Sequence, residues 1–188
     1  MAKKRPLGNF VWIDLEMTGL DIHTDVILEI ATVITDGNLN FIAEGPAFVI
    51  SQPEEKLLRM DKWCVEQHGK SGLTQAVLSS TTSLAHAEKE TLHFIKKHCL
   101  EHTGVLAGNT VWQDKIFLNK YMPTITHYLH YRIVDVSTCK ELVRHWYGKE
   151  NQPHIASTEF KKSDNHRALD DIYESIAELD YYKKHFFV

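Results

Sequence analysis

The run Trp12–Glu16, Trp-Ile-Asp-Leu-Glu, places two carboxylates inside a stretch that otherwise reads as a buried strand. Alternate side chains of a strand point to the same face, so Asp14 and Glu16 are expected to converge. Like charges held this close repel one another, and burial makes their ionisation costlier. A divalent cation with oxygen ligands is the usual way to stabilise such a pair. The alternative is that the two acids only mark a strand end before the turn at Gly19.

The bulk composition is that of an ordinary globular protein. Of 188 residues, 43% are hydrophobic and 24% are charged, so we expect one domain over residues 1–188. The three cysteines are widely spaced and suggest neither a metal site nor a disulfide framework, which favours a reducing cytoplasm. No signal-peptide core follows the basic start, and no apolar run reaches membrane-spanning length. We therefore expect a soluble, cytoplasmic protein.

The formal net charge of −4 argues against a surface that coats long nucleic acids. It is compatible with a local site for a short strand, because bound cations would supply positive charge there.

The order of the expected elements predicts a mixed α/β sheet covered by helices. Runs rich in Val, Ile and Phe predict strands at the start, and helical spacing of apolar residues begins after Ser51. A capping box at Thr138 and Glu141 is expected to open one of the helices. Residues 148–165 are polar and irregular and predict a mobile surface loop. The expected strands are 10–15, 27–35, 41–50, 104–107 and 131–136, and the expected helices include 83–102, 112–122, 138–146 and 166–184.

Two further segments contribute acids. Asp114 falls near the start of the expected helix 112–122 and shares its inward face with apolar residues. The last expected helix opens with His166 and continues with Asp170 and Asp171. The alternative for each segment is an acid that only favours the positive end of a helix dipole. Periodicity alone does not decide between Asp170 and Asp171.

Taken together, these segments suggest a metal-dependent nuclease or phosphatase. Two divalent ions about 4 Å apart need several carboxylates, and they stabilise the attacking and leaving oxygens of phosphodiester cleavage. A neutral histidine, whose reference pKa is about 6.5, can take a proton from the attacking water. A mobile loop before His166 would let that base arrive only when substrate is bound.

Three motifs that contain the acids follow one another along the chain. They are the runs 14–20 (Asp-Leu-Glu-Met-Thr-Gly-Leu), 108–114 (Gly-Asn-Thr-Val-Trp-Gln-Asp) and 166–171 (His-Arg-Ala-Leu-Asp-Asp). Between them lie 60–63 (Met-Asp-Lys-Trp) and 130–138 (His-Tyr-Arg-Ile-Val-Asp-Val-Ser-Thr). In these motifs the chain resembles the DEDDh group of 3′→5′ exonucleases, and within it the oligoribonuclease subfamily, over nearly its whole length.

The resemblance implies an RNase H-like fold with a five-stranded mixed sheet. It also implies a metal-dependent 3′→5′ exoribonuclease that hydrolyses short oligoribonucleotides, chiefly dinucleotides such as pGpG, to 5′-mononucleotides at the end of RNA decay. His166 would be the general base. Two Mg²⁺ or Mn²⁺ ions would be held by Asp14, Glu16, Asp114 and Asp171, so the resemblance selects Asp171 over Asp170.

The resemblance also implies a set of substrate-binding residues in a homodimer. Leu20 would be a wedge between the two terminal bases, and Trp63 an aromatic wall of the 3′ base pocket. His68 and Ser71 would help to hold the substrate, and Tyr131 and Arg132 would cap the 5′ phosphate in the neighbouring subunit. The alternatives are that Leu20 and Trp63 are core residues, that His68 lies on the surface, and that Tyr131 and Arg132 belong to an ordinary strand edge.

The chain departs from the family pattern in two places. The stretch from Trp146 to His166 is longer than usual, and Trp112 stands where a smaller residue is expected and is interpreted as helix packing. The rival functions are a DEDDh exonuclease on longer RNA or DNA strands, of the proofreading or tRNA-trimming type, a binding module that lost its chemistry, and a phosphatase. Acidic charge, Trp63 and the pair Tyr131–Arg132 argue against the longer-strand enzyme.

Overall fold

The centre of the sheet is formed by two long antiparallel strands, β1 (Phe10–Met17) and β2 (Ile27–Thr35). The computed structural model describes residues 8–147 and 167–187. Every residue of β2 is buried, because helices cover both faces of the sheet at this strand. The predicted strand 27–35 is confirmed at both ends.

The sheet is mixed, as predicted. Its strands lie in the order β3, β2, β1, β5 and β6, and the short strand β4 pairs with β2 outside this row. Strand β5 runs parallel to both β1 and β6, whereas β2 is antiparallel to its three partners. The remaining strands are β3 (Phe41–Glu44), β4 (Phe48–Val49), β5 (Val105–Gly108) and β6 (Ile133–Asp135).

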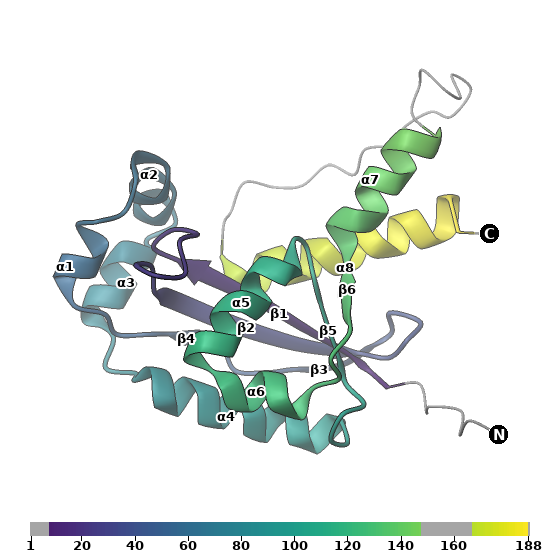
Figure 1. The fold of residues 1–188 in the computed structure, drawn as a ribbon, viewed down its shortest axis with the longest axis horizontal. Coiled ribbons are helices and arrows are strands. Elements are labelled where there is room, and N and C mark those ends of the chain that lie inside the picture. Colours follow the sequence, from purple (N-terminus) through teal and green to yellow (C-terminus); the bar gives the residue numbers. More distant parts are fainter. Residues whose placement is uncertain (1–7, 148–166, 188) are drawn as a thin grey trace.

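The helices form a layer on each face of the sheet and a separate group at one end (Figure 1). One layer consists of α4 (Leu84–His98), α5 (Val111–Tyr121) and α6 (Pro123–Tyr128), and the other of α7 (Val136–Tyr147) and α8 (Ala168–His185). The end group consists of α1 (Glu54–Leu57), α2 (Lys62–Lys70) and α3 (Leu73–Ser79). No described helix combines the length and the apolar composition that crossing a bilayer requires.

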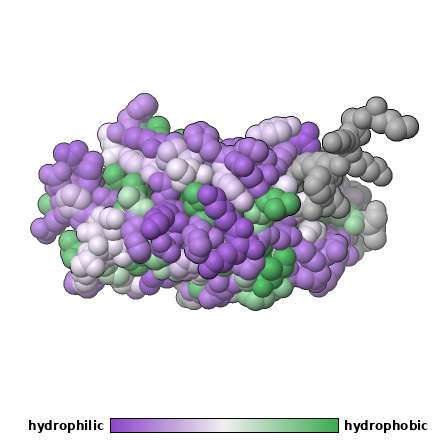
Figure 2. All heavy atoms as spheres, turned by 90° about the horizontal axis from the view of Figure 1, so that it is seen from below, coloured by the Kyte–Doolittle hydropathy of each residue, from purple (hydrophilic) through white to green (hydrophobic). Residues whose placement is uncertain are grey.

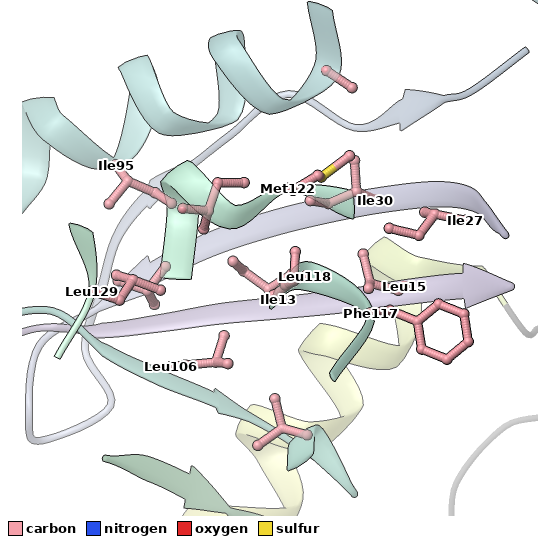
Figure 3. Close-up of a cluster of buried hydrophobic side chains, with 14 of the residues drawn as sticks. Ile13, Leu15, Ile27, Ile30, Ile95, Leu106, Phe117, Leu118, Met122 and Leu129 are labelled. Atoms are coloured by element: carbon pink, nitrogen blue, oxygen red, sulfur yellow. The ribbon is translucent and has the colours of Figure 1, made fainter. Parts of the chain in front are cut away.

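The alternation of β1 decides which helices face its acids. Ile13 and Leu15 pack into the core beneath α4, α5 and α6, as Figure 3 shows. Trp12 points to the opposite face, where it packs in one cluster with Ala168 and Tyr182 of α8. Because side chains alternate along a strand, Asp14 and Glu16 continue the row of Trp12 toward α8. Figure 2 shows a different, mainly hydrophilic face on which hydrophobic residues form small separate groups.

The prediction of one strand over residues 41–50 was wrong, because this segment forms two short strands. Gly45 and Pro46 separate β3 from β4. Proline has no N–H for a sheet hydrogen bond. A side chain at Gly45 would also meet Phe94, since a Cβ there would lie 2.7 Å from the ring.

Several element boundaries also differ from the predictions. The capping box at Thr138 was wrong, because α7 already begins at Val136 and the Asp135 carboxylate accepts a hydrogen bond from the Ser137 N–H at 2.9 Å. Helix α4 ends at His98 rather than at 102, because the backbone becomes extended at Cys99. Strand β6 covers only Ile133–Asp135, so Tyr131 and Arg132 precede it.

The two departures from the family pattern have different outcomes. Trp112 is 52% exposed, so its interpretation as helix packing was wrong. The predicted loop 148–165 lies outside the described residues.

Candidate functional site

Three carboxylates from two elements meet on the α8 face of the sheet. Asp14 and Glu16 extend from β1 toward the first turn of α8, which contributes Asp171. One oxygen from each side chain lies within 4.8 Å of the others. The predicted convergence of Asp14 and Glu16 is therefore confirmed. Asp170, the neighbour that periodicity could not separate from Asp171, is exposed.

A fourth acid approaches β1 from helix α5. Asp114 is only 6% exposed, and its Oδ1 accepts a hydrogen bond from the Leu15 N–H at 3.0 Å. Leu15 lies between the two acids of β1, so this bond fixes the start of α5 beside them. Asp114 is not one of the three residues whose oxygens lie within 4.8 Å of one another.

Two carboxylates of this site, Glu16 and Asp114, resist ionisation. Burial raises the pKa of Glu16 to about 8, and the negative charges of Asp171, Glu29 and Asp114 add to this effect, while Arg167 opposes it. Burial also raises the pKa of Asp114 to about 7, although the hydrogen bond from Leu15 works in the other direction. The site therefore needs positive charge if both groups are to be ionised at neutral pH.

The donor set fits a divalent cation of the Mg²⁺ class. Such ions prefer carboxylate oxygens, and the converging groups here are all carboxylates, without sulfur or nitrogen among them. A cation between Asp14, Glu16 and Asp171 would favour their charged forms and remove the cost that burial imposes on Glu16.

A partly buried ion pair that the sequence analysis missed lies next to these acids. Glu29 of β2 is the cross-strand partner of Glu16, and it accepts hydrogen bonds from Arg167, including one from Nε at 3.0 Å. The same carboxylate accepts a hydrogen bond from the Ala168 N–H at 3.3 Å, at the start of α8. One signal was available, since a glutamate inside a continuous apolar run requires a partner when buried.

The predicted nucleotide-binding residues have contrasting environments. Leu20 and Trp63 are 68% and 58% exposed, so the alternative that they are core residues was wrong. His68 is 2% exposed, so the alternative of a surface histidine was wrong as well. The His68 Nε2–H donates to Met17 O at 2.9 Å, and its Nδ1 lies 3.8 Å from Glu16 Oε2. Ser71 is half-buried at the end of α2.

The predicted cap residues form an exposed but ordered pair. Arg132 Nε donates to the hydroxyl of Tyr131 at 3.1 Å, and its guanidinium lies 5.5 Å from the centre of that ring. The Tyr131 ring also stacks on His130, with ring centres 4.5 Å apart. Lys115 of α5 donates to the carbonyl of Tyr131. Tyr131 is 71% exposed, and it is nevertheless held by two contacts to its ring and by one hydrogen bond to its backbone carbonyl.

His166 lies outside the described residues. The structure describes its neighbour Arg167, which the pairing with Glu29 fixes at the start of α8.

Comparison with known proteins agrees with this architecture. A family model described as Exonuclease, RNase_T, matches residues 11–179. An oligoribonuclease of Pseudomonas syringae pv. syringae is 52% identical over 95% of this chain and 96% of its own. The human protein named oligoribonuclease, mitochondrial, is 54% identical over 94% of this chain and 73% of its own.

Solved structures show the same fold at lower identity. A zinc-bound crystal structure of E. coli exonuclease I with single-stranded DNA has a TM-score of 0.70 and 16% identity. It covers 96% of this chain, which spans only 41% of that longer protein. This likeness supports the RNase H-like fold and nothing finer. The family match and the close relatives together show that the chain belongs to the DEDDh exonucleases and, within them, to the oligoribonucleases, a family of 3′→5′ exoribonucleases.

Proposed function

We propose that this chain hydrolyses short oligoribonucleotides from the 3′ end, chiefly dinucleotides such as pGpG, to 5′-mononucleotides at the end of RNA decay. The observation that carries the proposal is the convergence of Asp14, Glu16 and Asp171 within 4.8 Å, in a chain whose relatives are named oligoribonucleases. We further propose that residues 1–188 form one exonuclease domain.

Two divalent ions, Mg²⁺ or Mn²⁺, would be held by Asp14, Glu16, Asp114 and Asp171. When bound, they would stabilise charge on the attacking and leaving oxygens of the phosphodiester. The four carboxylates supply the negative charge that holds the ions, and the Leu15–Asp114 hydrogen bond keeps α5 in register with β1. His166 takes the proton from the attacking water, and the bond of Arg167 to Glu29 anchors the chain beside that base.

A site for two bases needs apolar and aromatic surface near the carboxylates. Leu20 and Trp63 offer exposed side chains of this kind, and stacking on an aromatic ring contributes about 1–3 kcal/mol per base. His68 of α2 lies 3.8 Å from Glu16, and Ser71 follows at the end of the same helix, so these two residues suit a role in holding the substrate backbone.

The preference for dinucleotides would come from a cap on the 5′ phosphate. Arg132 is suited to this role, because a guanidinium presents several donors to phosphate oxygens. In the proposed homodimer, Tyr131 and Arg132 of one subunit reach the substrate of the other. Their exposure in a single subunit is consistent with that arrangement.

The described cysteines Cys64, Cys99 and Cys139 are free thiols, which is typical of a reducing compartment. We propose a cytoplasmic location on this ground.

The test is cleavage of a 5′-labelled RNA dinucleotide and of a seven-residue RNA, each with Mn²⁺ and with EDTA. Fast, metal-dependent loss of the dinucleotide with slower trimming of the longer strand is the expected result. Preference for the longer strand would refute the capped site and favour an exonuclease of the proofreading or tRNA-trimming type. Equal activity in EDTA would refute the metal assignment.

A further inference from the structure

The loop between β1 and β2, residues 18–26, is a closely bonded segment that presents an exposed leucine. Its two ends are joined directly, because the Thr18 N–H donates to Val26 O at 3.0 Å. The Val26 N–H in turn donates to the Thr18 hydroxyl at 3.1 Å. Leu20, at 68% exposure, is thus held by an ordered backbone although it adds nothing to the core.

Asp25 fills the inside of this loop. Its carboxylate accepts hydrogen bonds from the Thr18 hydroxyl at 2.8 Å and from the Asp21 N–H at 2.9 Å. These two donors flank Leu20 in the sequence, so one side chain ties together both arms of the turn. Gly19 leaves room for it, since a Cβ at this position would lie 2.5 Å from Asp25 Oδ2.

Helix α5 fastens the loop from the outside (Figure 1). Tyr121 donates its hydroxyl hydrogen to Asp25 O at 2.6 Å, and Gln113 Nε2 donates to Leu20 O at 3.0 Å. Lys120 donates to the carbonyl of Ile22. These side chains are seven and eight residues apart, so they lie on one face of the helix. The same helix carries Asp114, and the position of Leu20 relative to this acid is therefore set by α5.

We propose that Asp25, Gln113 and Tyr121 are positioning residues that hold Leu20 where it contacts a nucleotide base. The inference rests on the proposed function, in which Leu20 separates the two terminal bases of a short RNA. None of the three needs to touch the substrate. They act by fixing the loop before the substrate binds, so that binding carries no entropic cost of ordering the loop. A dinucleotide makes few contacts, and the loss of this preorganisation should therefore weaken its binding strongly.

The first test compares Tyr121→Phe with Tyr128→Phe. Both tyrosines donate to a backbone carbonyl, but Tyr128 lies on α6 and its hydroxyl donates to Cys99 O at 2.8 Å, at the end of α4 rather than in the loop. For an RNA dinucleotide with Mn²⁺, we expect Tyr121→Phe to raise KM about three- to tenfold, as for one lost hydrogen bond, with kcat within about twofold. Tyr128→Phe should change neither constant.

The second test asks whether the effect passes through Leu20. In a Leu20→Ala background, Tyr121→Phe should raise KM no further, because the side chain that it positions is absent. Gln113→Ala removes a less buried bond to the same loop and should raise KM in the same direction, which keeps the test valid if Tyr121→Phe folds poorly.

The outcomes separate this inference from the proposed function. A wild-type protein that does not cleave the dinucleotide would overturn both. If the wild type cleaves it while Tyr121→Phe and Gln113→Ala keep the wild-type KM, only the positioning role is wrong. An equal rise of KM with and without Leu20 would also contradict it, since the bond would then act on something else.

Discussion

The carboxylate of Asp114 accepts a hydrogen bond from the backbone N–H of Leu15, the residue between Asp14 and Glu16, at 3.0 Å. Two residues that are 99 positions apart in the sequence thereby join strand β1 to helix α5 beside the acids of β1. Asn at position 114 would keep this acceptor oxygen and lose only the charge.

We therefore expect Asp114→Asn to fold normally and to lose turnover by about a hundredfold or more, the scale for a group that stabilises developing charge. Circular dichroism and dinucleotide hydrolysis with Mn²⁺ would measure the two effects. Asp170→Asn is the matched control, because Asp170 is exposed beside Asp171 and should keep wild-type turnover. Near-normal activity of Asp114→Asn would contradict the assignment of this residue as a metal ligand.

The raised pKa of Glu16 predicts how stability depends on pH without metal. Its pKa rises from 4.5 to about 8 on folding, so its carboxyl group favours the folded state most below pH 4.5. That contribution is lost as the pH rises toward about 8, because the charged form is buried at a cost. The melting temperature in EDTA should therefore fall between these pH values.

Glu16→Gln should flatten this fall, whereas Glu66→Gln, at an exposed ion pair with Lys70, should leave it unchanged. Mn²⁺ should raise the melting temperature of the wild type more at pH 8 than at pH 6, since it favours the charged carboxylates. Identical pH profiles for the wild type and Glu16→Gln in EDTA would show that Glu16 does not cause the fall.

Two exposed tryptophans allow a test of the base-stacking role. Trp63 and Trp146 are similarly exposed, at 58% and 56%. Trp63 belongs to α2, next to the acidic site, whereas Trp146 belongs to α7. Trp63→Ala should weaken dinucleotide binding by about 1–3 kcal/mol, the value of one stacked base. Trp146→Ala should have no such effect. Isothermal titration with a dinucleotide and Ca²⁺ would measure both, and equal losses would argue against stacking at Trp63.

The cap predicts a dependence on the 5′ phosphate. Arg132→Ala should weaken binding of a 5′-phosphorylated dinucleotide about tenfold or more, because a charge-assisted bond is lost. Binding of the same dinucleotide without this phosphate should stay near the wild-type value. Arg144→Ala, an exposed arginine that pairs with Glu141, serves as the control. If both dinucleotides lose affinity equally in Arg132→Ala, the residue does not recognise the phosphate.

The Glu29–Arg167 pair predicts a larger stability effect than surface pairs. Glu29→Gln removes an ion partner that is 4% exposed, from an arginine that is 37% exposed. We expect a loss of about 1–3 kcal/mol in the free energy of unfolding, between the values for fully buried and exposed pairs. Glu141→Gln breaks an exposed pair and should cost less than about 1 kcal/mol. Urea denaturation measures both, and equal losses would contradict a special role for Glu29.

Sequence patterns predicted those parts of the fold that follow from local periodicity. The unbroken apolar run of β2 and the alternation of Asp14 and Glu16 are examples, because each depends on one strand alone. The division of strand 41–50 was missed although the local pair Gly45–Pro46 was a signal for it, and the close approach of Gly45 to Phe94 of a distant helix could not be seen in the sequence. The missed capping at Asp135 combines a local bond from the Ser137 N–H with a distant one, because this carboxylate also accepts a hydrogen bond from the Thr110 N–H at 3.0 Å.

The supporting contacts of the site could not be read from sequence for a related reason. The partners of Glu29 and of Tyr121 lie 138 and 96 residues away, and no spacing rule connects them. Motifs indicated which residues gather, but the hydrogen bonds that orient them are properties of the packed structure.

The pairing of Glu29 with Arg167 has a consequence for how the chain assembles during synthesis. Glu29 is the only charged residue of β2, and its partner Arg167 is made 138 residues later. Until α8 leaves the ribosome, this carboxylate lacks its guanidinium partner, and the face of the sheet on which α8 packs lacks the cover of that helix. The nascent sheet should therefore stay open to water and to chaperones, and the acidic site should form only as the last helix docks.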